Sequence, residues 1–205
     1  GVVALNGELD AETAAEISRY FVEVVVARSI SGDARAALAR KTNLRVLIAP
    51  IPSSHAVNLR TIDDGFLVQE RDSVLGESTN WEPKSRRPTV DEMRNLELAW
   101  VVAAHTKSNA IVVVNDGAAV GVGAGDQSRV GAAERALVKA GERSVGAVAA
   151  SDGFFPFRDG LDVLATAGVT AVVEPGGSIK DDEVIAAAKE HDLAIMFTNR
   201  RHFRH

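Results

Sequence analysis

Four short stretches in the second half of the chain carry the side chains best suited to chemistry. They are "GAGDQSR" (123–129), "SDGFFPFRD" (151–159), "EPGGS" (174–178) and "TNRRHFRH" (198–205). They supply a glycine-rich turn, a cluster of phenylalanines beside a proline, several carboxylates and a cluster of arginines. Arginines in such a cluster suit a phosphate, which their planar fork of donors binds with two hydrogen bonds.

Each of these features also has a structural interpretation. The backbone N–H groups of "EPGGS" could hold an anion at the start of a helix, or the stretch is a tight turn capped by Ser178, which the motif alone favours. Arg129 could pair with a phosphate or carboxylate, or be solvated. The basic end could be a frayed tail, but Phe203 and the apolar run before it favour an anchored one.

The composition limits the class of protein. The chain has 205 residues, a net charge of −5 and no Cys. Disulfides and thiolate metal sites are therefore excluded, and a reducing, cytoplasmic setting fits. With this net negative charge, no general binding of nucleic acid is expected. The longest apolar runs, such as "AIVVV", are far shorter than the roughly 20 residues of a membrane span, so no membrane partner is expected.

The first half of the chain shows weaker patterns. Apolar spacing predicts a helix from Asp10 to about Ala27 with Asp10 as N-cap, and a short helix over 33–40. "GVVALN" (1–6) and "LRVLIA" (44–49) are typical of buried strands. Because the chain opens on such a strand, we expect it to begin inside a domain; a processed N-terminus is the alternative.

Regular patterns fade between Pro50 and Pro88, where "GFLVQ" is the one clear strand. This region is the expected boundary between two lobes. The sequence therefore predicts two domains, 1–88 and 89–205.

The second half is strongly patterned. Thr89 and Glu92 form a capping box for a helix over 89–106, two strands flank a turn at 115–117, and 128–143 is helical. Three strands then alternate with two helices, which predicts parallel strands with right-handed crossovers. The fold class is α/β, with a mixed, partly parallel sheet and helices on both faces. Ligands gather at the C-terminal ends of parallel strands, so the four stretches should converge there.

Five motifs in this order, "TKSNAIVV", "GVGAGDQSRV", "ASDGFFPFRDGLD", "VEPGGSIKDDEVIAAA" and "TNRRHFRH", resemble one family. It is the bifunctional purine biosynthesis family, which couples phosphoribosylaminoimidazolecarboxamide formyltransferase to inosinate (IMP) cyclohydrolase. The likeness is to the transformylase half, and "GVVALN", "GFLVQERD" and "WEP" extend it along the chain. The resemblance implies formyl transfer from 10-formyltetrahydrofolate to the 5-amino group of the aminoimidazole carboxamide ribonucleotide.

The resemblance also implies an architecture. Transformylase domains of this family have two cytidine-deaminase-like, three-layer lobes. The chain resembles the end of the first lobe and all of the second. Family members are homodimers with active sites across the subunit interface, so a homodimer is the expected assembly.

Matching positions imply the site residues. Asn109 is similar to the catalytic Asn beside the reacting amine. Side chains implied to bind the nucleotide substrate are Arg129, Phe154, Arg201 and His205. Those implied to bind the folate are Val130, Pro156, Phe157, Asp159 and Ser178. Flat heterocycles need rigid apolar walls, which the Phe-Phe-Pro-Phe loop supplies, unless the loop is a local core cluster.

The resemblance also points to a cation site and to two differences between this chain and the family. Ser108 and Asp152 match positions near a monovalent cation in some relatives, although a structural role for both is favoured and no dedicated metal site is expected. Asp126 replaces the usual Gln. The Lys-His pair that the family uses for proton transfer is absent, as is the cyclohydrolase domain. We therefore expect a fragment that binds ligands but does not turn over.

Three other functions compete with this resemblance. A zinc deaminase needs Cys ligands, which the chain lacks. A non-catalytic purine-nucleotide-binding module would keep the ring and phosphate contacts without the base. A dinucleotide-dependent oxidoreductase rests only on "GVGAG", whose third glycine is misplaced for a fingerprint.

Overall fold

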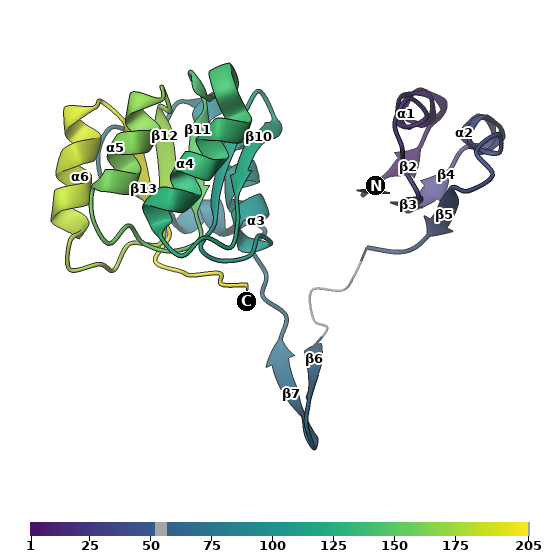
Figure 1. Cartoon of the computed structure of the whole chain (residues 1–205), viewed down its shortest axis with the longest axis horizontal. Coiled ribbons are helices and arrows are strands. Elements are labelled where there is room, and N and C mark those ends of the chain that lie inside the picture. The colour runs from purple at the N-terminus through teal and green to yellow at the C-terminus, as the bar shows by residue number, and fades with distance from the viewer. Residues whose placement is uncertain (52–56, 205) are drawn as a thin grey trace. The chain divides into compact units, whose positions relative to one another are not determined.

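The computed structural model describes residues 1–51 and 57–204. The chain divides into two compact units, Gly1–Arg71 and Asp72–His205 (Figure 1). This division falls earlier in the chain than the predicted boundary after residue 88.

Unit 1 combines short strands with two short helices. Its elements are β1 (Val2–Ala4), β2 (Glu8–Leu9), α1 (Ala11–Ile17), β3 (Val24–Ala27), β4 (Ser29–Ile30), α2 (Gly32–Leu38), β5 (Arg45–Ile48), β6 (Val57–Ile62) and β7 (Gly65–Glu70). Strands β1, β3 and β5 form a parallel sheet in the order β1-β3-β5, and β2 pairs with β4. Asp10 caps α1 by accepting a hydrogen bond from the N–H of Thr13, as predicted.

The predicted helix over 10–27 is wrong beyond its first half. Helix α1 ends at Ile17, and Val24–Ala27 form β3 in the middle of the sheet. β-branched valines lose rotamer freedom in a helix and pack well on a pleated sheet, so the run "VVV" continues as strand. The apolar spacing that suggested one long helix therefore runs through two separate elements, α1 and β3.

Helices α1 and α2 cover only one face of the β1-β3-β5 sheet. Val25 and Ala27 pack there against Ala14, Ile17, Ala34 and Leu38. On the opposite face, Val2 is 72% exposed and Leu47 is 53% exposed. The prediction that "GVVALN" and "LRVLIA" are buried strands is therefore correct about the strands and wrong about their burial.

The predicted strand "GFLVQ" is confirmed as β7, which pairs with β6 in an antiparallel hairpin. The pattern did not predict β6. The alternation in the hairpin places Val57, Leu59, Phe66 and Val68 on one face, and all four side chains are exposed.

Unit 2 is built on one six-stranded sheet. Its elements are η1 (Glu77–Asn80), β8 (Glu82–Pro83), α3 (Val90–Ala104), β9 (Ile111–Asn115), β10 (Ala118–Gly123), α4 (Arg129–Ala140), η2 (Gly141–Ser144), β11 (Val148–Ser151), α5 (Asp159–Thr166), β12 (Ala171–Glu174), α6 (Asp181–Glu190) and β13 (Ala194–Phe197). The strand order is β10-β9-β11-β12-β13-β8. Strands β11, β12 and β13 are parallel, and the remaining pairs are antiparallel. The mixed, partly parallel sheet is confirmed.

Helices cover both faces of this sheet (Figure 1). Helices α4, α5 and α6 pack on one face, around residues such as Val113, Val172 and Ile195. Helix α3 packs on the other, where Trp100 and Trp81 meet Val112 and Val173. The alternating side chains of β9 and β11–β13 serve the two cores in turn, so these strands are buried nearly throughout.

Several predicted features of unit 2 are confirmed. Thr89 and Glu92 form the capping box of α3, and β9 and β10 form the hairpin around Asp116 and Gly117. The "GVGAG" glycines have a packing role. A Cβ at Gly121 would lie 2.1 Å from the carbonyl oxygen of Ala136, and one at Gly123 would lie 1.9 Å from that of Ala132. Both glycines lie within β10, so α4 can rest directly on the strand backbone.

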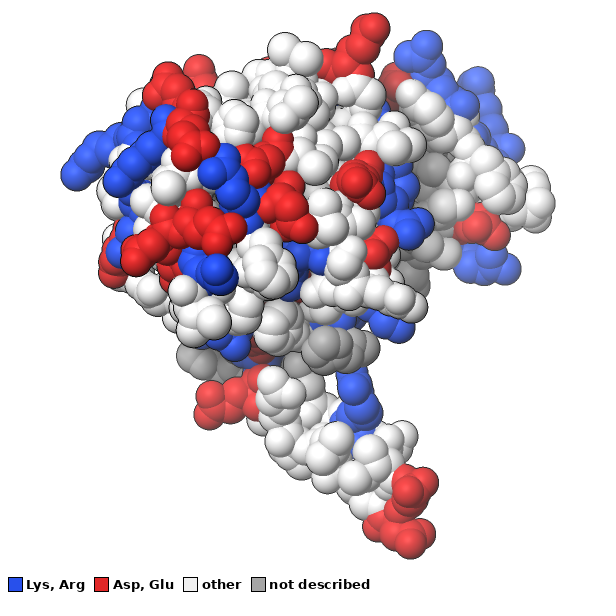
Figure 2. All heavy atoms as spheres, turned by 60° about the vertical axis from the view of Figure 1, so that its left-hand side comes forward, with Lys and Arg blue, Asp and Glu red and all other residues white. Residues whose placement is uncertain are grey.

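Acidic and basic side chains are interspersed on the surface near α5 and α6 (Figure 2). Arg158 pairs with Asp162 and Glu190 there, and Lys180 pairs with Glu183. Among the residues that the structure describes, no helix is long and apolar enough to cross a membrane.

Candidate functional site

Three loops and the C-terminal segment meet at one edge of the unit 2 sheet. The loops after β11 and β12 begin at the C-terminal ends of parallel strands, and the segment after β13 runs along the same end (Figure 1). The loop between β10 and α4 joins them through Arg129. The predicted convergence of the four stretches therefore has a structural basis.

Arg129 is at the centre of this edge. Its guanidinium is only 8% exposed and pairs with the carboxylate of Asp152. It also donates to the hydroxyl of Ser151 at 3.1 Å and to Oδ1 of Asn109 at 2.9 Å. Buried charges need such partners, because an unpaired one loses its hydration without compensation. The solvated interpretation of Arg129 is wrong.

The same contacts orient Asn109. Its Oδ1 accepts from Arg129, and its Nδ2 donates to the backbone oxygen of Asp126 at 2.9 Å. These two partners fix the amide orientation and leave the second hydrogen of Nδ2 for another acceptor. Asn109 can thus donate a hydrogen bond at this edge, but it cannot remove a proton.

Asp126 helps to place Arg129. Its carboxylate pairs with Arg135 at 2.9 Å and accepts from the N–H of Ser128. The hydrogen bond from Arg135 and that from Ser128 lower the pKa of Asp126. Ser128 in turn caps α4 by accepting from the N–H of Gly131. The carboxylate of Asp126 therefore supports the first turn of α4, where a negative charge is favourable.

The aromatic loop divides between core and edge. Phe155 is fully buried and belongs to the core, so the core-cluster interpretation holds for this residue. Phe154 is half-buried, and the guanidinium of Arg201 lies 5.0 Å from the centre of its ring. Gly153 has no room for a side chain, since a Cβ there would lie 2.4 Å from Nη2 of Arg129 and 3.0 Å from the ring of Phe203.

The Gly-Gly turn holds a carboxylate from its own chain. The N–H groups of Gly177 and Ser178 donate to the carboxylate of Asp181 at 2.7 and 2.9 Å. The hydroxyl of Ser178 accepts from the N–H of Lys180. These contacts favour the turn interpretation over a free anion site. The turn still borders the edge, because a Cβ at Gly177 would lie 3.5 Å from Nη2 of Arg201.

Glu174, at the end of β12, connects the aromatic loop to this turn. Its side chain is fully buried and accepts from the N–H of Phe155 at 2.9 Å, while Oε1 has no hydrogen-bond partner among the described residues. Burial raises the pKa of Glu174 to about 8, against the opposing effect of the Phe155 N–H. A neutral carboxyl group at neutral pH follows from this environment.

The remaining predicted site residues are less constrained. Pro156, Phe157 and Asp159 are exposed, and Asp159 accepts a hydrogen bond from the N–H of Gly160 at the start of α5. Val130 is half-buried on α4. Their folate-binding roles stay predictions. His205 lies outside the described residues.

A buried cluster around His202 was not predicted. The ring is 1% exposed, with Nδ1 2.6 Å from Asp72 Oδ2 and Nε2 2.9 Å from Glu77 Oε2. Trp100 packs edge-on against the ring and donates its Nε1–H to Glu77 at 3.0 Å. The partners are more than a hundred residues apart in sequence, so no local pattern indicates this cluster.

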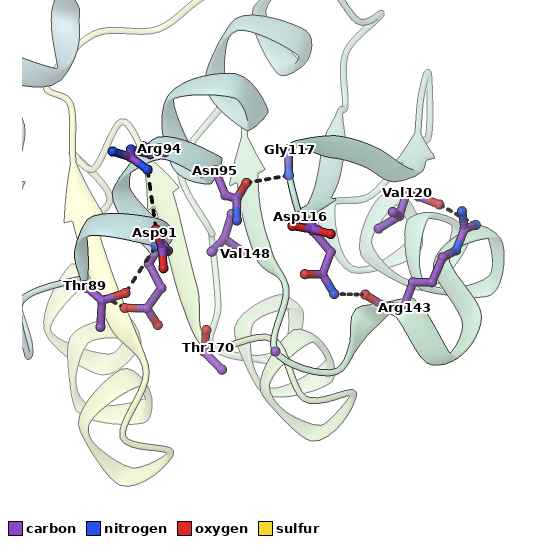
Figure 3. Close-up of a pocket in the computed structure, with 13 residues that line it drawn as sticks. Thr89, Asp91, Arg94, Asn95, Asp116, Gly117, Val120, Arg143, Val148 and Thr170 are labelled. Atoms are coloured by element: carbon purple, nitrogen blue, oxygen red, sulfur yellow. Dashed lines mark hydrogen bonds and ion pairs between the residues drawn. The ribbon is translucent and has the colours of Figure 1, made fainter. Parts of the chain in front are cut away.

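A hollow of about 1010 Å³ opens at the opposite edge of the sheet. It lies beside the start of α3, the Asp116–Gly117 turn and the residues that begin β11 and β12 (Figure 3). Asn95 there accepts a hydrogen bond from the N–H of Gly117 through its Oδ1. The buried charges and the arginine–aromatic contact lie at the other edge, which is therefore the better candidate site.

The described residues contain no group of three or more His, Cys, Asp or Glu able to hold a metal ion. Ser108 donates its hydroxyl hydrogen to Asp152, and the N–H of Ala110 donates to the same carboxylate at 3.0 Å. These contacts give both residues a structural role.

Comparison with known proteins adds a family to this geometry. Residues 1–139 match the family described as AICARFT/IMPCHase bienzyme. The chain is 48% identical over 219 residues to the bifunctional purine biosynthesis protein PurH of Rhizobium meliloti (strain 1021), and 46% identical over 208 residues to that of Aquifex aeolicus (strain VF5). Both alignments cover 100% of the chain and 41% of the relative, so the chain spans about two fifths of their length.

Proposed function

The chain belongs to the AICARFT/IMPCHase bienzyme family, and from this premise we propose that it carries the ligand-binding half of a formyl-transfer site. The reaction moves the formyl group of 10-formyltetrahydrofolate to the 5-amino group of 5-aminoimidazole-4-carboxamide ribonucleotide, in purine biosynthesis. The observation that supports this most strongly is the convergence of Asn109, Arg129, Phe154 and Arg201 at one sheet edge.

Each group at this edge has a role in the proposal. Arg201 is exposed and carries a charge suited to the nucleotide phosphate, with the ring of Phe154 behind it. The half-buried Phe154 and the exposed Pro156 and Phe157 offer flat walls for the planar rings of nucleotide and folate. Asp159, an exposed carboxylate, is suited to accept N–H donors from the pterin edge.

Formyl transfer also needs electrophilic assistance and a base. The acceptor amine is conjugated with the carboxamide and is a poor nucleophile. Attack on the formyl carbon requires a donor for the developing oxyanion and a group that removes the proton of the amine. Asn109, oriented by Arg129, is suited to the first task through its second Nδ2 hydrogen.

No described residue of this edge is suited to be the base. Asp152 is fully buried and paired with Arg129. Glu174 has a pKa near 8 but no exposed surface. His202 faces two carboxylates. We therefore propose that the chain alone binds both ligands without appreciable turnover, and that the complete site is formed by a longer chain and its homodimer.

The proposal extends to architecture and cofactor. The three-layer arrangement of unit 2 is compatible with a cytidine-deaminase-like lobe. The folate acts as cosubstrate, and any monovalent cation would lie near the oxygens of Ser108 and Asp152. The setting proposed for the protein is the cytoplasm.

Formyl transfer by the 205-residue chain, assayed beside the Rhizobium meliloti relative, tests the proposal. We expect calorimetry to show binding of the ribonucleotide by the chain, with turnover lower by about a hundredfold to ten-thousandfold, the range attributed to a missing acid–base group. Near-equal turnover would show that the base is within this chain. Nucleotide binding without any effect of the folate would favour the non-catalytic nucleotide-binding module.

A further inference from the structure

The cluster around His202 has an unusual hydrogen-bond arrangement. Ionised carboxylates only accept hydrogen bonds, and both ring nitrogens of His202 face carboxylate oxygens, at 2.6 Å on Asp72 and 2.9 Å on Glu77. Donation to both ionised carboxylates would need a hydrogen on each ring nitrogen, whereas a neutral ring donates from one nitrogen only. The guanidinium of Arg200 lies 2.6 Å from the second oxygen of Glu77. Arg200 thus adds a second basic side chain beside the two carboxylates.

Burial makes this arrangement strong. The His202 ring is 1% exposed, and Glu77 is 8% exposed. Glu77 is held independently by the Nε1–H of Trp100, and Trp100 packs edge-on against both His202 and Trp81. In such a dry environment, charge-assisted hydrogen bonds are short and are worth more than exposed ones. The ring of His202 is therefore a firm attachment point on α3 and on the segment that follows unit 1.

The segment attached at this point forms part of the candidate site. Residues 199–204 are neither helix nor strand, so side-chain contacts decide their position. Arg201 precedes His202 and lies over Phe154. Phe203 follows it and lies against Gly153, and the backbone oxygen of Arg204 accepts from the N–H of Ser108 at 3.0 Å. The anchored His202 thus lies between two residues, Arg201 and Phe203, that contact the loop after β11.

We propose that His202 is a positioning residue, whose buried ring pairs with Glu77 and with the partly exposed Asp72 and so fixes the C-terminal segment, placing Arg201 at the phosphate end of the site. This inference rests on the proposed function for its ligand. The role of His202 is indirect, since its own ring is enclosed by protein groups.

Titration with two probes tests the proposal in the full 205-residue chain. The probes are 5-aminoimidazole-4-carboxamide ribonucleotide and the matching riboside, which lacks the phosphate. We expect His202→Leu to weaken ribonucleotide binding by about tenfold to a hundredfold, the range of a lost charge-assisted contact, and to leave riboside binding unchanged. In an Arg201→Ala background, the same change should have no further effect, because both act on one contact.

The matched control is His191→Leu. The ring of His191 also pairs with a carboxylate, Asp162, at 2.8 Å, but it lies at the end of α6. Its removal should leave the affinity for the ribonucleotide unchanged. If His202→Leu does not fold, Asp72→Asn removes one partner at a side chain that is 45% exposed and should weaken ribonucleotide binding by a few-fold.

Amide exchange separates this inference from the proposed function. The N–H of Ser108 donates to Arg204, so its exchange rate reports the position of the C-terminal segment without any ligand. We expect faster exchange in His202→Leu and no change in His191→Leu. Unchanged exchange, or ribonucleotide affinity equal to that of the unsubstituted chain, overturns the positioning role. A parent chain that does not distinguish ribonucleotide from riboside contradicts the proposed phosphate site instead.

Discussion

The two units bury strands of similar composition to different extents. In unit 1, the residues of β3 alternate between half-buried and buried, whereas those of β12 in unit 2 are buried throughout. The cause is the number of covered faces. Helices α1 and α2 pack on one face of the first sheet, while α3 and the group α4–α6 pack on both faces of the second.

A sheet with helices on both faces can also enclose charged side chains, which a sheet with helices on one face does not. Unit 2 encloses Arg129, Asp152, Glu174 and His202 among its packed layers, each at or below 8% exposure. Among the described residues of unit 1, every buried side chain is apolar. A site that depends on water-excluded charges therefore belongs to the unit with two cores.

The largest expected effect would test the contrast in burial directly. Trp100 is 1% exposed in the α3 core, so Trp100→Ala should destabilise unit 2 by about 3–5 kcal/mol. Phe21 in unit 1 is 84% exposed, and Phe21→Ala should change the free energy of unfolding by less than about 0.5 kcal/mol. Urea unfolding measures both, with Trp81 fluorescence reporting unit 2. Comparable losses in the two variants would break the contrast.

Glu174→Gln should stabilise unit 2 in a pH-dependent manner. The folded-state pKa of about 8 lies above the unfolded value near 4.5, so folding takes up a proton between these values and stability falls as the pH rises through this window. The neutral isostere removes this cost, on the order of 3 kcal/mol at pH 7 and almost nothing at pH 4. Melting temperatures from pH 4 to 9 measure it. A constant difference across that range would contradict the buried neutral acid.

Glu92→Gln should have the opposite pH dependence and a smaller effect. Burial raises the pKa of Glu92, but hydrogen bonds from Arg86, Thr89 and Thr170 outweigh it and lower the pKa to about 2. The ionised group therefore stabilises the fold fully above about pH 4.5, and the contribution is lost as the pH falls through 2. We expect a loss of about 1–2 kcal/mol at pH 7.

Acid titration of the two proteins checks this expectation. The stability difference between Glu92→Gln and the unsubstituted chain should shrink below pH 4 and vanish near pH 2. A difference that persists at pH 2 would show that shape, rather than charge, fixes the capping box.

The smallest effect concerns the open face of unit 1. Leu47 is 53% exposed on β5, so Leu47→Ser should cost less than about 1 kcal/mol in the isolated chain. Val25→Ser, at a fully buried position on β3, serves as the matched change and should cost several times more. Circular dichroism during urea unfolding compares them. Equal costs would mean that both faces of the sheet are covered.

The fold of unit 2 was accessible from the sequence because its signals are local. The capping box at Thr89, the Asp-Gly turn and the alternation of strands and helices each specify one element. Unit 1 was less accessible. The valines after Phe21 continue the helical spacing of α1, and only their β-branched character and their pairing with distant strands show that they form β3. Whether a strand is buried also depends on which helices pack on its sheet, and the sequence of the strand alone does not specify this.

The candidate site was predictable as far as loops at one sheet edge. The strand order predicted that the stretches with Arg129, Phe154 and Arg201 would meet, and the family resemblance added Asn109. Neither revealed that Asp181 fills the Gly-Gly turn or that Glu174 is buried with a raised pKa. The His202 cluster was missed altogether. Its acidic partners come from the segment before α3, and contacts over such a sequence separation leave no periodic signal.

The two glycines of β10 against which α4 packs limit the substitutions that the protein can accept. The carbonyl oxygens of Ala132 and Ala136 occupy the space where Gly123 and Gly121 would carry a methyl group. Because Arg129 starts that helix, any side chain at either glycine would lift the guanidinium away from Asn109. A library randomised along β10 and selected for ligand binding would thus recover glycine at both positions, because they set where α4 begins.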